Sequence, residues 1–157
     1  MTWRGSMTVK DRIFASLTYL LPLLDVFPFG RHLIEQVPLF GLIYVPIEPL
    51  LVIYNKSFVS LIIFFVLYLA VVRNERINHF IRFNAMQAIL ISIILTLISL
   101  AFGILGPVLG QNLLTQTLVN IIFLGTLAAS IYSIIQSAIG RYAELPGISE
   151  ASYLQVR

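Results

Sequence analysis

The stretch that decides the fold of this chain is Arg73-Asn74-Glu75-Arg76-Ile77-Asn78-His79-Phe80-Ile81-Arg82-Phe83-Asn84-Ala85-Met86-Gln87-Ala88-Ile89-Leu90. It places three arginines and several amide side chains at the mouth of a long apolar segment, in a chain otherwise poor in charge. Cations concentrated at a short turn orient the helices of a membrane protein, and polar side chains beside them mark a helix entrance. The candidate residues at this helix entrance are Arg73, Arg76, Arg82, Phe83, Asn84, Met86 and Gln87.

The composition places the whole chain in a lipid bilayer. Hydrophobic residues make up 59% of the 157 residues and charged residues 11%, against about 45–50% and about 25% in soluble domains. A soluble fold of this size has too much surface to tolerate such a composition. The net charge of +3 is spread over segment ends without a basic stripe, so nucleic acid is not an expected partner. We predict an all-α integral membrane protein with a single domain, residues 1–157.

Three apolar stretches have the character of membrane-spanning helices. Residues 85–105 and 118–139 each contain no Asp, Glu, Lys, Arg or His and reach the length of about 20 residues that a span requires. Residues 58–72 are shorter, but Lys56 and Arg73 flank them and extend toward the membrane surface. These three stretches and residues 13–29 are the four predicted spans, and a mobile tail is expected at residues 141–157.

Prolines interrupt the two remaining apolar stretches. In residues 13–29 they stand close to the end, and the helix is expected to kink or stop there, near Pro22, Asp25 and Pro28. Residues 37–54 contain Pro38, Pro46 and Pro49. The backbone hydrogen bonds that these prolines remove would stay unsatisfied in lipid. We therefore interpret residues 37–54 as an interfacial or re-entrant segment between the first and second of four transmembrane helices.

The distribution of cations supports four spans over five. With four, the N-terminal tail, the Arg73–Asn84 turn and the C-terminal tail share one side of the membrane. Eight cations then face two, Arg31 and Lys56, whereas five spans split them four against six. The positive-inside rule prefers the first arrangement, with both termini on the cytoplasmic or stromal side. The eight are Arg4, Lys10, Arg12, Arg73, Arg76, Arg82, Arg141 and Arg157.

Small and hydroxyl residues recur on one face of each of the last two spans. Such spacing allows close helix approach and hydrogen bonds between helices. One interpretation is a packing seam between the two spans; the other is a polar path toward a substrate or a second subunit. The residues of this predicted polar seam are Ser92, Thr96, Ser99, Gly125, Ala129, Ser133 and Gln136.

Glu48 is the candidate membrane acid. An ionised carboxylate at the centre of a membrane costs about 2.5–3.5 kcal/mol on insertion scales. Glu48 is therefore protonated, paired or facing water if it lies at depth, or solvated if its segment is interfacial, which we favour. Asp25 is interpreted as a solvated cap or turn residue. No nucleophile with a base and no metal-ligand cluster is recognisable, so neither catalysis nor a cofactor is expected.

The amino-acid sequence of residues 73–90 resembles the Tic20 family. The resemblance is greatest in Arg82-Phe83-Asn84-Ala85-Met86-Gln87-Ala88. This family is the twenty-kilodalton subunit of the protein translocon at the inner envelope membrane of chloroplasts, and it has cyanobacterial relatives. The segments Tyr19–Asp25 and Pro49–Leu51 are also similar to family segments, and the resemblance covers roughly residues 10 to 140. Where family members carry an aspartate shortly after the signature, this chain has Ser92.

The resemblance implies four transmembrane helices with both termini cytoplasmic or stromal. It also implies a polytopic translocon subunit that helps precursor polypeptides cross or enter a membrane. Expected partners are the lipid bilayer, other membrane subunits or further copies of the chain, and an unfolded precursor. The membrane is a cyanobacterial plasma or thylakoid membrane or the plastid inner envelope, and the short N-terminus favours the cyanobacterial branch. Two alternatives stay open: an assembly or stabilising subunit of a larger membrane complex, and a small-solute or proton carrier that uses Glu48.

Overall fold

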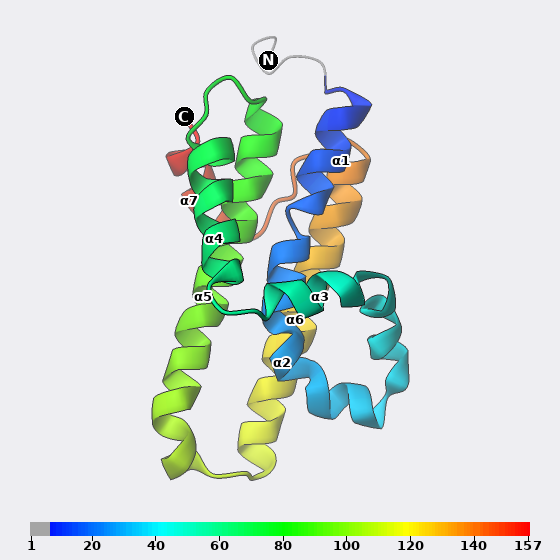
Figure 1. Ribbon diagram of the computed structural model, residues 1–157, viewed down its shortest axis with the longest axis vertical. Coiled ribbons are helices and arrows are strands. Elements are labelled where there is room, and N and C mark those ends of the chain that lie inside the picture. Colours follow the sequence, from blue (N-terminus) through cyan, green and yellow to red (C-terminus); the bar gives the residue numbers. More distant parts are fainter. Residues whose placement is uncertain (1–6) are drawn as a thin grey trace.

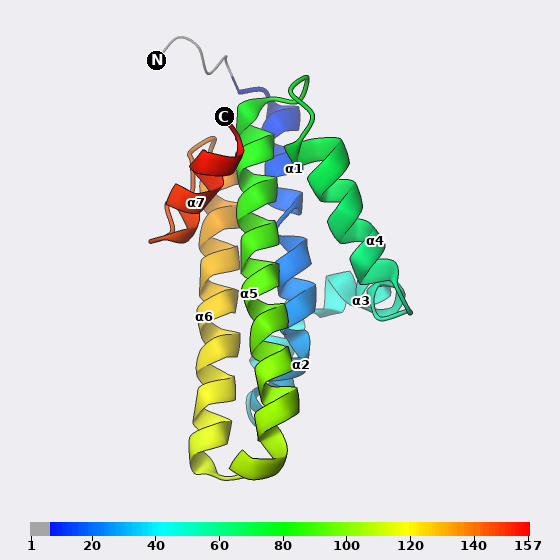
Figure 2. The ribbon, with the colours of Figure 1, turned by 90° about the vertical axis from the view of Figure 1, so that its left-hand side faces the viewer.

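Two long helices, α5 (His79–Leu109) and α6 (Leu113–Ala138), form a hairpin that runs most of the length of the molecule (Figures 1 and 2). The structure is a computed structural model that describes residues 7–157, and within that range every regular element is a helix. The other elements are α1 (Val9–Leu17), α2 (Leu20–Gln36), η2 (Pro38–Ile43), η3 (Val45–Ile47), α3 (Glu48–Tyr54), α4 (Val59–Val66), the π-helical η4 (Leu67–Val72) and α7 (Ile148–Gln155).

Side-chain caps and a glycine set the limits of the hairpin helices. Asn78 starts α5 by accepting a hydrogen bond from the Phe80 amide at 2.9 Å. Asn112 starts α6 in the same way by accepting from the Thr115 amide at 3.0 Å. Between them, Gly110 ends α5 with a φ of 67°, a backbone conformation that favours glycine. The turn is therefore short, and α5 continues through Pro107 to reach it.

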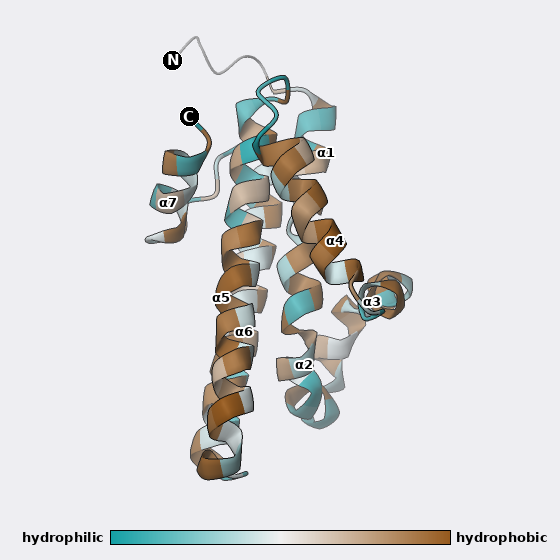
Figure 3. Ribbon diagram, turned by 60° about the vertical axis from the view of Figure 1, so that its left-hand side comes forward, coloured by the Kyte–Doolittle hydropathy of each residue, from teal (hydrophilic) through white to brown (hydrophobic). Residues whose placement is uncertain are grey.

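The helices confirm an all-α membrane protein. Three are long and apolar enough to cross a membrane: Val9–Gln36, which joins α1 and α2, then α5 and α6. A fourth span is obtained if the pair Pro38–Tyr54 and Val59–Val72, bent by 101°, counts as one. Apolar residues dominate the middle of α4 and α5, whereas the polar residues gather toward the ends of the bundle (Figure 3). The predicted proline-rich segment thus lies between the first span and the consecutive helical segments α4 and η4.

The sequence predicts that the first helix kinks or stops near Pro22, Asp25 and Pro28, and this prediction is wrong for Asp25 and Pro28. The helix continues through Pro28 to Gln36, and the break lies earlier, at Thr18 and Tyr19, between α1 and α2. Pro22 explains the position, because its missing N–H deprives the Thr18 carbonyl of its usual donor four residues ahead. The Leu21 amide bonds that carbonyl instead, at 3.2 Å, in the tighter geometry of a 3₁₀ turn.

Residues 37–54 form two 3₁₀ segments and the short α3 rather than one continuous helix. Figure 1 shows α3 lying across the direction of the long helices. Tyr44 ties this segment to the bundle: its side chain is buried, and its hydroxyl donates to the Leu23 carbonyl at 3.1 Å. The Tyr44 ring also packs edge-on against Phe27 and stacks on Phe123. Leu51 and Tyr54 of α3 are buried as well, while most of the other residues of the segment stay exposed.

The C-terminal tail, for which the sequence predicts mobility, contains a helix packed against the bundle. Residues 148–155 form α7, which packs against α5. Ser149, Ser152 and Val156 are buried. The Tyr153 ring lies against the ring of Phe83, with centroids 4.4 Å apart. The tail is polar in composition, but specific buried contacts hold it against the start of α5.

The three segments expected on one side of the membrane lie together at one end of the bundle (Figure 1). Asn78, before α5, donates to the Asp11 carboxylate of α1 at 3.2 Å. His79 and the Tyr142 hydroxyl of the tail lie 3.0 Å apart. Arg4, one of the cations counted there, lies outside the described residues. This grouping is what a four-span arrangement requires, and the side of the membrane that this end faces remains a prediction.

A glycine permits the contact between α2 and α6. A Cβ atom on Gly30 would overlap the ring of Phe123, which is completely buried. We expect Gly30→Ala to lower the free energy of unfolding by about 1–3 kcal/mol, as overpacking of a core does. Thermal unfolding in detergent measures the effect.

Gly103→Ala is the matched control, because a Cβ at Gly103 meets no atom within 4 Å. It should leave the stability unchanged or raise it slightly, since alanine favours a helix. Equal melting temperatures for the two variants would contradict the proposed contact between α2 and α6.

Candidate functional site

The signature stretch divides into an exposed turn and a buried helix start. Arg73 and Arg76 are exposed in the turn before α5. Arg82 is buried, and its Nε donates to the carbonyl of Val72 at 2.8 Å, which satisfies the C-terminal end of η4. Most of the residues predicted to form an open helix entrance are thus inside the protein. The buried ones are Arg82, Phe83, Asn84, Met86 and Gln87.

Asn84 is the centre of a buried polar network. Its Oδ1 accepts hydrogen bonds from the Tyr19 hydroxyl at 2.7 Å and from the Ser137 hydroxyl at 3.0 Å. Its Nδ2 donates to the Phe80 carbonyl at 2.8 Å. Asn84, Tyr19 and Ser137 are all completely buried or nearly so. One amide side chain therefore connects the junction between α1 and α2 with α5 and α6.

Gln87 extends this network to the C-terminal tail. Its Nε2 donates to the Tyr19 hydroxyl at 2.9 Å and to the Ala143 carbonyl at 3.0 Å. Its Oε1 accepts from the Ser149 hydroxyl at 2.8 Å, and Ser149 in turn accepts from the Leu145 amide. We call Tyr19, Asn84, Gln87, Ser137 and Ser149 the amide network. Every polar atom that it uses is paired inside the protein, so its evident task is to hold the helices together.

The predicted polar seam is not a single face between the last two spans. On α6, Ser133 is buried, Ala129 and Gln136 are partly buried, and Gly125 is exposed. The helix packs mainly against α1 and α2 and much less against α5. On α5, Ser92 is buried, whereas Thr96 and Ser99 are exposed. The prediction of a seam between α5 and α6 is therefore wrong.

The face of α6 that packs against α1 and α2 carries Ser133, which the sequence analysis selected, and three further hydroxyl residues that it did not select. Thr126, Ser130, Ser133 and Ser137 are all buried. They follow one another at intervals of four, three and four residues, which places them on one side of a helix. This spacing was available in the sequence, but the prediction followed the glycine and alanine positions beside it.

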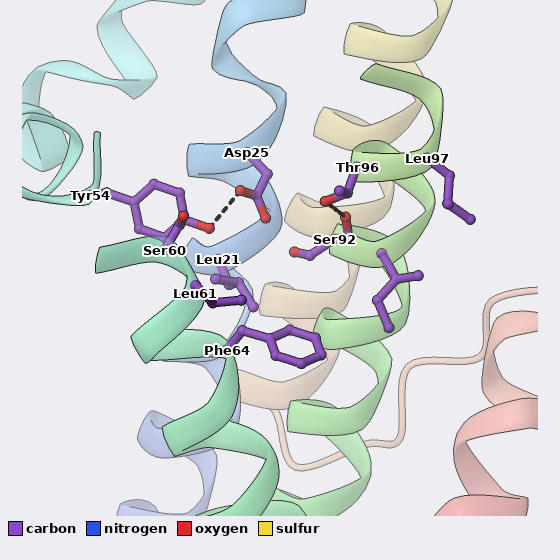
Figure 4. Close-up of a pocket in the computed structure, with 10 residues that line it drawn as sticks. Leu21, Asp25, Tyr54, Ser60, Leu61, Phe64, Ser92, Thr96 and Leu97 are labelled. Atoms are coloured by element: carbon purple, nitrogen blue, oxygen red, sulfur yellow. Dashed lines mark hydrogen bonds between the residues drawn. The ribbon is translucent and has the colours of Figure 1, made fainter. Parts of the chain in front are cut away.

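A pocket of about 330 Å³ lies between α2, α4 and α5 (Figure 4). Asp25 of α2 stands at its edge and is partly buried, and its Oδ1 accepts a hydrogen bond from the Tyr54 hydroxyl at 2.5 Å. Ser92 is 5% exposed, and its Oγ has no hydrogen-bond partner. We call this the Asp25 pocket. It is lined by Leu21, Asp25, Tyr54, Ser60, Leu61, Phe64, Ser92, Ile93, Thr96 and Leu97.

Asp25 rather than Glu48 is the acid that lies within a helix long and apolar enough to cross a membrane. Glu48 is exposed in the first turn of α3, which agrees with the solvated alternative for this residue. Asp25, interpreted from the sequence as a solvated turn residue, lies in the middle of α2 with a bonded carboxylate. The correction follows from the helix continuing beyond Pro28, because this carries Asp25 into the bundle. No group of three or more His, Cys, Asp or Glu residues in the described part of the chain is placed to hold a metal ion.

The amide network makes a prediction for Gln87. Gln87→Glu keeps the shape but removes the donors to Tyr19 and Ala143, so we expect a loss of about 1–3 kcal/mol in stability. The tail should then detach from α5, and trypsin should cleave faster after the exposed Arg141. Gln155→Glu, the same change at an exposed position of α7, is the control. Equal rates of cleavage in the two variants would show that Gln87 does not hold the tail.

Comparison with known proteins gives a consistent assignment. A family model described as Chloroplast import apparatus Tic20-like matches residues 8–152. A Tic20 family protein of Synechocystis sp. is 55% identical over 150 residues, which is 94% of each chain. Protein TIC 20-II, chloroplastic, of Arabidopsis thaliana is 31% identical over 163 residues, 99% of this chain and 78% of the relative. A Tic20 family protein of Gracilaria tenuistipitata var. liui is 34% identical over 160 residues, 97% of this chain and 78% of the relative. The chain is a membrane protein that belongs to the Tic20 family.

Proposed function

We propose that this protein is a polytopic subunit of a protein translocon, which helps precursor polypeptides to cross or enter a membrane without chemistry of its own. The observation that carries the proposal is the match of residues 8–152 to a family described by chloroplast import. That match includes α1 to α6 and most of α7. The proposed membrane is a cyanobacterial plasma or thylakoid membrane or a plastid inner envelope, with both termini cytoplasmic or stromal.

The packing supports a path for the precursor polypeptide along the outside of the helix bundle. Asn84 and Gln87 fill its interior at one end, and both are completely buried. The Asp25 pocket opens instead toward the surface, where Leu61 and Leu97 are 50% and 60% exposed. A polypeptide would therefore pass beside α4 and α5. The other wall would come from further membrane subunits or from a second copy of the chain.

An assembly subunit is the second candidate function, and one face of α6 favours it. Gly125 is exposed, and a Cβ atom placed there meets nothing within 4 Å. Small residues of this kind let a partner helix approach closely in a membrane. A solute or proton carrier based on Glu48 has less support, because that carboxylate is exposed and lines none of the pockets described above.

The translocon proposal predicts contact with a precursor at the mouth of the Asp25 pocket. The chain contains no cysteine, so a photoreactive probe can be attached to a single cysteine at Leu61 or Leu97. We expect adducts with a precursor arrested during transport through membranes that contain the protein. Leu154, exposed on α7, is the control position and should give none. Absence of adducts at Leu61 and Leu97 in transport-competent membranes would count against the proposal.

The assembly proposal predicts a different result for Gly125→Leu. Because the site is open, the substitution should leave the thermal stability of the isolated protein unchanged. If a partner helix packs there, co-purification of partner subunits in mild detergent should fall severalfold. Leu124→Ile, a change of shape at a neighbouring exposed position, is the control. Unchanged co-purification with Gly125→Leu would argue against an interface on this face.

A further inference from the structure

The polar groups that line the Asp25 pocket come from four helices, α2, α3, α4 and α5. Asp25 of α2 and Tyr54 of α3 form a hydrogen-bonded pair, and Ser92 points toward Asp25 from α5 (Figure 4). Thr96 and Ser60 add hydroxyls to the same lining. The rest of the wall is apolar, chiefly Leu21, Leu61, Phe64 and Leu97. The pocket is thus amphipathic, with one carboxylate and several hydroxyls on an otherwise hydrocarbon surface.

Two polar groups in this pocket lack a partner that burial in a membrane requires, a hydrogen-bond partner for Ser92 and an opposite charge for Asp25. Ser92 is almost completely buried, and its hydroxyl points toward the Asp25 carboxylate but makes no hydrogen bond of ordinary geometry (Figure 4). Asp25 carries a carboxylate into a membrane span, and the Tyr54 hydroxyl gives it a hydrogen bond but no opposite charge. Lys56 lines an adjoining pocket of about 340 Å³ together with Asp25 and Tyr54, but it forms no ion pair with Asp25 within 4.0 Å in the described part of the chain. A cation with N–H donors that enters the Asp25 pocket would give Ser92 a hydrogen-bond partner and Asp25 an opposite charge.

A primary ammonium on an aliphatic chain fits this lining better than a metal ion. One carboxylate supplies a single negative charge, and the mostly apolar wall does not suit an ion that retains water. An ammonium has three N–H donors, which Asp25 and the hydroxyls of Ser92 and Thr96 are placed to accept. The methylene groups of a lysine would then pack on Leu61 and Phe64, as lysine side chains do when their charged end finds a polar site.

We propose that the Asp25 pocket receives the side chain of a lysine in an apolar segment of the polypeptide being moved. The segment enters from the lipid side, past Leu61 and Leu97, and the ion pair with Asp25 offsets the cost of its charge in the membrane. This inference rests on the proposed translocon function and names the feature of the polypeptide that the pocket recognises.

Disulfide formation in lipid nanodiscs tests the pocket directly. The full-length chain with Leu97→Cys is mixed with a synthetic leucine–alanine helix that carries one cysteine beside one lysine. The matched peptide has glutamine in place of the lysine. We expect the lysine peptide to form the disulfide at least about tenfold more efficiently, as loss of a partner from a desolvated ion pair predicts. Ile104→Cys, exposed on α5 outside the pocket, should not distinguish the peptides.

Asp25 variants separate charge from structure. Asp25→Asn can still accept the hydrogen bond from Tyr54, so the thermal stability should be retained while the preference for the lysine peptide disappears. Asp25→Glu keeps the charge and should restore part of the preference. A lysine preference that survives in Asp25→Asn, or its absence from the unaltered pocket, would overturn the inference.

The two proposals fail in different ways. Precursor adducts at Leu61 and Leu97 without any dependence on lysine or Asp25 would leave the translocon function standing and refute the lysine site. A lysine preference in nanodiscs without precursor adducts in transport-competent membranes would refute the translocon function. It would then assign the pocket to a lysine of a stable partner helix.

Discussion

The hydrogen bonds of Asn84 and Gln87 are the interaction on which the arrangement of the other helices depends. In lipid, the apolar surfaces of helices gain little by leaving their surroundings, so packing and hydrogen bonds between helices decide which helices associate. Asn84 binds Tyr19 and Ser137, and Gln87 binds Tyr19 and Ser149. Two amides one helical turn apart therefore position the first span, the last span and the C-terminal tail around α5.

The concentration of polar bonds at one end leaves the rest of the molecule more open. Below the amide network, α5 has exposed residues along its outer face. The π-helical η4 packs against α5, whereas α4 diverges from it (Figure 2). The Asp25 pocket is lined by residues of both α4 and α5. The short α3 closes one side of that pocket through Tyr54. Rigid anchoring at one end and a laterally accessible pocket farther along is an arrangement suited to receiving a segment from the lipid.

Much of the architecture could be predicted, because membrane burial imposes strong rules on a sequence. Continuous apolar length identified α5 and α6, three prolines excluded a continuous helix over residues 37–54, and the cations indicated which segments share an end. The predictions that failed depend on how particular side chains or backbone groups pair and pack. Pro22 broke the helix upstream of itself at Thr18, and the prediction had not considered the carbonyl that loses its donor.

The sequence by itself determined that this chain is a helical membrane protein, because hydrophobicity and charge act through their average along a segment. It also marked Asn84 and Gln87 as residues of a helix entrance. Only the tertiary structure decided that they are buried, that the polar tail folds onto α5, and that Asp25 rather than Glu48 faces a pocket. The physical reason is that each outcome depends on hydrogen-bond partners tens of residues away, such as Tyr19 for Asn84 and Tyr54 for Asp25. Local patterns do not specify such pairings.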